Sequence, residues 1–151
     1  MYVVSQEEKV AILKRTVEDF IPFNQMLSIK YVSADPVKLS IKNRPELVGN
    51  ALRQILHGGV IATLLDVVGG MAILNNVLET FEFESQSDIP KKLARSGTID
   101  LRVDYIRPGK GEEFFATGQI IRQGNRVSVT RMELHNEEQT LIALGTGTYV
   151  V

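Results

Sequence analysis

A chain of 151 residues is long enough for a sizeable hydrophobic core, and we expect a single domain over residues 1–151. The formal net charge of −1 gives no general attraction to nucleic acid or to a membrane surface, so neither partner is expected. The absence of cysteine excludes disulfides, a thiol nucleophile and thiolate metal ligands, and the charged N-terminus is unlike a signal peptide, so we expect a cytoplasmic protein.

The first part of the chain is predicted to form a helix followed by two strands. Ser5 and Glu8 have the spacing of a capping box, so a helix is expected from there to about residue 19, with Pro22 ending it. Strands are predicted at 26–32 and 37–42, and a turn at 33–36 joins them. A loop is predicted at 43–56.

The segment from about residue 58 to 78 is predicted to be a buried central helix. Its apolar run from Val60 to Leu74 is shorter than the roughly 20 residues that span a bilayer, and Asp66 interrupts it, so we expect no membrane insertion. Gly69 and Gly70 each disfavour a helix interior by roughly 1 kcal/mol relative to alanine. A glycine inside a helix usually stands where another backbone or a ligand comes close.

The second half of the chain is predicted to be a mobile loop followed by four strands. Residues 80–94 are polar and irregular, and this favours the loop. The strands are expected at 97–107, 113–123, 126–136 and 139–151. Turn sequences between them predict three hairpins in a row and therefore an antiparallel sheet. One long apolar helix before these strands indicates an α+β fold in which the sheet curls around the helix.

Gly58 and Gly59 stand where the central helix begins, and there the first N–H groups have no partner within the helix. Glycine lets a ligand oxygen approach these donors, which is the geometry of an oxyanion hole for acyl transfer. A glycine-rich helix start with solvent as its partner is the alternative.

Asp66 is the carboxylate of this apolar helix, and its burial is unfavourable unless it is paired or used. The alternative is a structural Asp satisfied by threonine or backbone donors. Gly59 and Asp66 are seven residues apart, or about 10 Å along the axis, so one chain cannot easily bring both to one carbonyl group. Two antiparallel copies of the helix across a two-fold axis bring them together. If Asp66 is catalytic, we therefore expect an obligate homodimer.

The two histidines and the basic residues give weaker indications. His57 is a candidate base, a donor that orients the loop, or an N-cap, and we favour a structural or polarising role. With His135 far away in a predicted strand, no metal site is expected. Charges at a sheet edge are the simple interpretation of the basic residues, but together around two turns they could bind phosphates. These residues are Arg107, Lys110, Arg122, Arg126 and Arg131.

Several of these motifs together resemble one family. The pattern consists of Gly49-Asn50, Leu56-His57-Gly58-Gly59, Leu65-Asp66, the run from Asp100 to Pro108, and the run from Arg122 to Arg126. It resembles the hotdog-fold acyl-CoA thioesterases, above all the phenylacetate-pathway type and the related medium- and long-chain acyl-CoA thioesterases. The resemblance covers about residue 44 to the C-terminus. It implies a hotdog fold, in which a curved antiparallel sheet wraps around one long central helix, here with an N-terminal helix before it.

The resemblance also implies roles for individual residues. Asp66 would be the general base or the nucleophile, and a backbone N–H of Gly58, with Gly59 close behind, would polarise the thioester carbonyl. His57 would support this start of the helix, and Thr98 would position the attacking water. Many relatives carry a carboxamide six residues before the histidine, where this chain has Ala51. Asn50 is preferred to Gln54 as its counterpart.

Substrate contacts are implied in two places. The nucleotide of CoA is expected along one turn, near Arg122, Gln123, Gly124, Asn125 and Arg126, with Arg107 as a further basic contact. The acyl chain is expected in an apolar slot between the helices, under the loop at 80–94 and bordered by Val60, Leu64, Val67 and Met71. No cofactor is expected besides the acyl-CoA substrate.

The expected function is therefore hydrolysis of a medium- or long-chain fatty, or an aryl, acyl-CoA thioester by a homodimer, with pairing into tetramers left open. A non-catalytic acyl-CoA-binding or sensing module on the same fold is the alternative, because fold does not fix function. A dehydratase of this fold fits less well, since it is expected to pair a catalytic histidine with an acid at another spacing.

Overall fold

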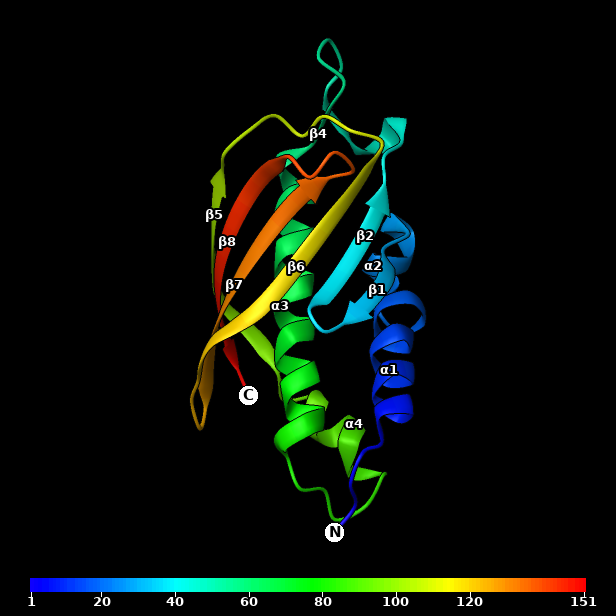
Figure 1. Ribbon diagram of the computed structural model, residues 1–151, viewed down its shortest axis with the longest axis vertical. Helices are drawn as coiled ribbons and strands as arrows, with labels where there is room; N and C mark the ends of the chain where they lie inside the picture. The colour runs from blue at the N-terminus through cyan, green and yellow to red at the C-terminus, as the bar shows by residue number, and fades with distance from the viewer.

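A six-stranded antiparallel sheet curves around helix α3 (Gly58–Thr80) in the computed structural model, which describes residues 1–151 (Figure 1). The strands, in sheet order, are β1 (Lys30–Ala34), β2 (Val37–Lys42), β6 (Glu113–Gln123), β7 (Val127–Asn136), β8 (Leu141–Val150) and β5 (Gly97–Tyr105). The predicted α+β hotdog architecture is confirmed.

Helix α3 forms the centre of the core because the concave face of the sheet closes over it. Leu64, Leu65 and Val68 have no exposed surface, and they pack with Met132 and Leu134 of β7 in one continuous cluster. By length and composition alone α3 would also suit a membrane span, and it is longer than predicted. More than half of its most apolar stretch of 18 residues is buried inside the protein, so here it is a core helix.

Glycines let the sheet approach α3 closely. A Cβ at Gly118 of β6 would lie 2.7 Å from the main-chain oxygen of Val68, and a Cβ at Gly69 would overlap the hydroxyl of Tyr149. The close neighbour of Gly69 is therefore a side chain, and not the backbone or ligand that was predicted. Gly70, in contrast, has only an ordinary van der Waals contact with the Tyr149 ring.

The N-terminal segment folds into three short helices that lie along one side of the sheet (Figure 1). Helix α1 (Gln6–Arg15) has the predicted capping box and continues into a π-helical turn, η1 (Thr16–Phe20). Pro22 ends this segment but also begins helix α2 (Pro22–Leu27), since proline suits a first helical position. The strand predicted from Met26 is therefore wrong at its start. Ser28, in the left-handed region with φ 59°, ends α2 before β1 begins.

Two predicted loops contain regular structure. The segment before α3 holds a short 3-10 helix, η2 (Pro45–Leu47), and a small hairpin of β3 (Val48–Asn50) and β4 (Ile55–Leu56). The segment at 80–94 contains helix α4 (Asp88–Leu93), so the prediction of an irregular loop is wrong there. Phe83 and Ile89 anchor that segment in the core.

The order of strands corrects the prediction of three consecutive hairpins. β6–β7 and β7–β8 are hairpins, but β5 pairs with β8, and β6 pairs with β2. After leaving α3 the chain therefore builds the far edge of the sheet first and then crosses over to its middle. Turn sequences predict where a chain reverses, and they do not say which strand lies beside it.

Candidate active site

Asp66 lies on the side of α3 that faces the N-terminal end of β5 and the C-terminal end of β8. Its Oδ1 accepts a hydrogen bond of 2.9 Å from Thr98 Oγ1, and the Tyr149 hydroxyl lies 3.3 Å from the same oxygen. The side chain is only partly buried. The threonine donor is the one that the structural alternative predicted, whereas the partial exposure of the side chain is what a catalytic carboxylate needs.

The start of α3 presents a single unused backbone donor. His57 is the N-cap residue, and its Nδ1 accepts the N–H of Gly59 at 2.8 Å. The main-chain oxygen of His57 accepts from Val60 and Ile61. Gly58 N–H has no hydrogen-bond partner within the chain. Between the two glycines that the sequence indicated, the free donor is therefore that of Gly58.

His57 has the structural role that we favoured, because its ring closes the first turn of α3. Two further residues fix this turn. Gly49 packs directly on His57, and a Cβ there would lie 2.6 Å from the histidine Cα. Tyr105, the last residue of β5, donates a 2.9 Å hydrogen bond from its hydroxyl to the main-chain oxygen of Gly58. These contacts orient the free N–H.

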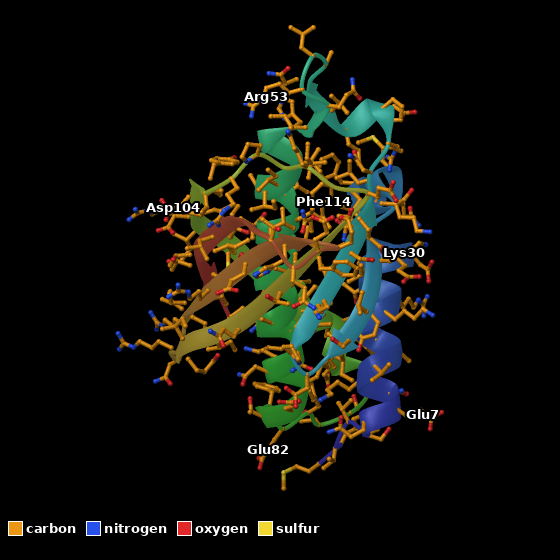
Figure 2. The ribbon with its side chains drawn as sticks, turned by 45° about the horizontal axis from the view of Figure 1, so that its top comes forward. Glu7, Lys30, Arg53, Glu82, Asp104 and Phe114 are labelled. Carbon is orange, nitrogen blue, oxygen red and sulfur yellow. The ribbon has the colours of Figure 1, made fainter.

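The candidate carboxamides both serve the loop in which they lie. Asn50 Oδ1 accepts from the Arg53 N–H at 3.1 Å, and Gln54 Nε2 donates to the main-chain oxygen of Ala51. Both side chains are exposed in this chain. Figure 2 shows Arg53 near the tip of this loop, beyond the start of α3. A role for Asn50 in the site stays a prediction.

The predicted substrate-binding residues fall into separate groups. Arg122, Gln123, Asn125 and Arg126 are exposed around the β6–β7 turn, where Gln123 accepts a 3.2 Å hydrogen bond from Asn76 of α3. Gly124 lies in the same turn and is partly buried. This turn lies at the Thr98 end of the sheet, since Arg126 O accepts from Val151 N just beyond β8.

Arg107 lies at the opposite end of β5, where its guanidinium donates to the main-chain oxygen of Leu141 at 3.1 Å. One chain therefore does not gather Arg107 and the β6–β7 turn into one phosphate site. Along α3, Val60 and Val67 are partly buried, whereas Leu64 is fully buried in the core. An acyl slot bordered by Leu64 would need the core to open, so within one chain that residue is a packing residue.

The carboxylate and the free backbone N–H, the two groups that the expected reaction needs, are also separated within one chain. Gly58 and Asp66 are eight residues apart on one helix, or about 12 Å along its axis. Thr98 and Tyr105, which hold them, lie at opposite ends of β5, about 23 Å apart at the usual strand rise. An open hollow of about 660 Å³ on the surface includes neither group and is lined by polar residues such as Lys42, Arg44 and Glu137.

Tyr105 and Tyr149 are the contacts that the sequence analysis missed. Tyr105 lies in the run from Asp100 to Pro108, which belongs to the family pattern but gave this tyrosine no role. Tyr149 is 83 residues from Asp66 in the sequence, and only the glycine at position 69 indicated a close neighbour.

Comparisons with known proteins show the family of this chain. Residues 53–143 match the thioesterase superfamily. The chain is 44% identical to the medium/long-chain acyl-CoA thioesterase YigI of Escherichia coli K12, covering 99% of this chain and 97% of that protein. It is 30% identical to mouse acyl-coenzyme A thioesterase 13, covering 83% of this chain and 82% of that protein. A crystal structure of a Shewanella oneidensis protein related to the thioesterase superfamily has a TM-score of 0.88 at 46% identity, covering 97% and 99% of the two chains.

The chain therefore belongs to the thioesterase superfamily. The resemblance that the motifs carried is confirmed, and so is the prediction of a thioester-hydrolysing enzyme.

Proposed function

We propose that this chain hydrolyses medium- or long-chain acyl-CoA thioesters at sites that two copies of the chain build together. One observation carries this proposal. Each half of the expected chemistry is held by an opposite end of the same edge strand, with Thr98 bound to Asp66 and Tyr105 bound to Gly58. A full-length relative at 44% identity is named a medium/long-chain acyl-CoA thioesterase, and this supports the substrate class.

The free edge of β5 supports the pairing of two copies. β5 pairs with β8 on one side only, and its other side has no strand partner. Antiparallel pairing of β5 with its own copy around a two-fold axis sets its N-terminal end beside the C-terminal end of the second copy. With Thr98 opposite Tyr105 of the second copy, Asp66 of one copy comes close to Gly58 of the other.

The reaction then follows from the two groups. Asp66 takes a proton from a water molecule, and the oxygen of that water forms a bond to the thioester carbonyl carbon. The negative charge that develops on the carbonyl oxygen is stabilised by the Gly58 N–H of the second copy. The carbon–sulfur bond breaks, and the CoA sulfur leaves and receives the proton that Asp66 holds. The products are the free acid and CoA.

Direct attack by Asp66 is the second route and gives a mixed anhydride that water then hydrolyses. Label in the Asp66 side chain after a single turnover in heavy-oxygen water identifies direct attack, because a general base forms no bond to the acyl group.

The substrate contacts of the proposal join groups that one chain keeps apart. In the paired arrangement, Arg107 of one copy lies at the same end of the joint sheet as the β6–β7 turn of the other. Arg122 and Arg126 of that turn are exposed and suit the phosphates of CoA. Val60 and Val67, partly exposed on α3, suit the acyl chain.

A panel of acyl-CoAs with a thiol reagent tests the proposed function. We expect CoA release from medium- and long-chain fatty acyl-CoAs, with aryl acyl-CoAs included as the other class that the motifs allow. An acyl-CoA sensor on this fold would bind the same compounds without releasing CoA. Asp66→Asn is expected to keep the fold and to lower kcat by about a thousandfold, the range of a lost general base. Turnover at the wild-type rate in Asp66→Asn would remove the role given to Asp66.

A further inference from the structure

A hydroxyl that no motif predicted contacts the carboxylate of Asp66. Tyr149, near the end of β8, is 3% exposed. Its hydroxyl lies 3.0 Å from the main-chain oxygen of Asp66 and 3.3 Å from Oδ1, so one hydrogen is shared between the two acceptors. Thr98 donates to the same Oδ1 from β5. Donors on neighbouring strands thus converge on Oδ1, whereas Oδ2 has no hydrogen-bond partner in the chain.

The simplest structural explanation is that Tyr149 only satisfies a helix carbonyl. Asp66 lies well inside α3, which continues to Thr80, so its main-chain oxygen already accepts the N–H four residues later. That oxygen needs no second donor to be satisfied. The contact with Oδ1 is what the Tyr149 hydroxyl adds.

Two glycines make the space that Tyr149 occupies. A Cβ at Gly69 would overlap the hydroxyl, and a Cβ at Gly147 would lie 2.6 Å from the ring atom Cε2. A glycine inside a helix is unfavourable by roughly 1 kcal/mol relative to alanine. The chain therefore accepts a less stable helix position in order to bring this side chain to Asp66.

Polar side chains lie close to Tyr149 in the core. Ser128 and Thr130 of β7 are completely buried on the same side of the sheet, and Ser128 is the register partner of Tyr149. Burial raises the pKa of Tyr149 above its ordinary value, and the negative charge of Asp66 raises that pKa further. The hydroxyl therefore stays protonated across the neutral range and remains a donor.

We infer that Tyr149 is a positioning residue, which together with Thr98 holds Oδ1 of Asp66 and leaves Oδ2 as the oxygen that acts on the substrate. The inference rests on the proposed function, because it assigns the two oxygens of the carboxylate that the function uses. Tyr149 acts through Asp66 and has no contact with the thioester.

Tyr149→Phe tests the inference because it keeps the ring in its slot and removes only the donor. We expect kcat to fall by about tenfold, the size of one lost hydrogen bond to a charged group, with KM changed by less than about twofold. Tyr31→Phe is the matched control. The Tyr31 side chain lies on β1, its hydroxyl has no hydrogen-bond partner in the chain, and wild-type kcat is expected.

Proton NMR of the Tyr149 hydroxyl gives a second readout that does not depend on activity. In wild type this proton bonds to a charged carboxylate, so it should resonate further downfield than in Asp66→Asn, where the acceptor is neutral. An identical resonance in both proteins would overturn the inference, and so would wild-type kcat in Tyr149→Phe. A lower kcat accompanied by an equal rise of KM and a lower Tm would show a structural role and would also overturn it.

The failures of the two proposals can be told apart. Full turnover in Asp66→Asn contradicts the proposed function itself. An inactive Asp66→Asn together with a fully active Tyr149→Phe contradicts only the role of Tyr149.

Discussion

The two edges of the sheet are treated in opposite ways by this chain. At the β1 edge, helix α1 and the turn η1 lie alongside the strand, and Glu18 accepts the main-chain N–H of Tyr31 at 3.0 Å (Figure 1). At the β5 edge nothing covers the strand, and Ile99 and Tyr105 are each 54% exposed. Figure 2 shows Asp104 on the outer side of this second edge.

The difference indicates that β5 is kept open for a purpose. An uncovered edge strand with apolar residues invites pairing with another chain, and proteins usually protect such edges. This chain protects one edge with its own residues and leaves the other free. The free edge is also the one whose ends hold Asp66 and Gly58. Assembly and catalysis are therefore connected at the β5 edge. Substitutions at either edge, or at Asp66 and Gly58, can test this connection.

Blocking the β5 edge is expected to have the largest effect. Ile99 lies in the register irregularity between Thr98 and Asp100 and is 54% exposed at this edge. Ile99→Asp replaces an apolar edge residue by a charged one, and a charge on an edge strand disfavours pairing with a second copy. We expect folded monomers by sedimentation and a loss of CoA release of more than about a thousandfold, since a monomer lacks a complete site.

Ile99→Val controls for this substitution. It shortens the side chain but keeps it apolar, so this variant should remain an active dimer. If Ile99→Asp also remains an active dimer, the β5 edge does not pair two copies in the proposed way.

Removing the free donor at the start of α3 is expected to have the next largest effect. Gly58→Pro loses the N–H, and proline suits this first helical position after His57, whose ψ of 136° is extended. We expect kcat to fall by about a hundredfold to a thousandfold, as for one lost oxyanion donor. Gly58→Ala adds a Cβ 3.3 Å from the Tyr105 ring but keeps the N–H, so its loss should be far smaller. Equal losses in the two variants would point to crowding instead of hydrogen bonding.

At the covered edge, the smallest effect is expected, and it concerns stability alone. Glu18→Gln leaves the Tyr31 N–H with a neutral acceptor and removes the weak ion pair with Lys30, whose atoms are 3.9 Å apart. We expect urea unfolding to show a free energy lowered by about 1 kcal/mol, with the dimer and kcat unchanged. A changed oligomeric state would mean that the β1 edge also takes part in assembly.

The sequence was informative wherever local chemistry decided the structure. The capping box of α1, the long apolar α3 and the positions of Asp66 and Gly58 follow from patterns within a few residues. Helical periodicity and the free N–H groups of a first helical turn are local properties, so one sequence is enough to predict them.

Contacts between distant segments could not be predicted in this way. The pairing of β5 with β8 depends on how the sheet closes around α3, and no turn sequence records it. Tyr149 reaches Asp66 only through that closure. Helix α4 was not predicted because it is short and mostly polar, with Ile89 as its one buried residue. In each of these cases tertiary packing outweighed the local pattern.

The central claim is that Gly58 of one copy and Asp66 of the other form one site, and a heterodimer tests it most directly. Copies carrying Gly58→Pro and Asp66→Asn are co-expressed with different tags, and the mixed dimer is isolated by two affinity steps. Each parent homodimer should be inactive, because both of its sites lack one group. The mixed dimer contains one intact site and should release CoA at about half the wild-type rate. A mixed dimer as inactive as its parents would contradict the shared site and would place both groups within one chain.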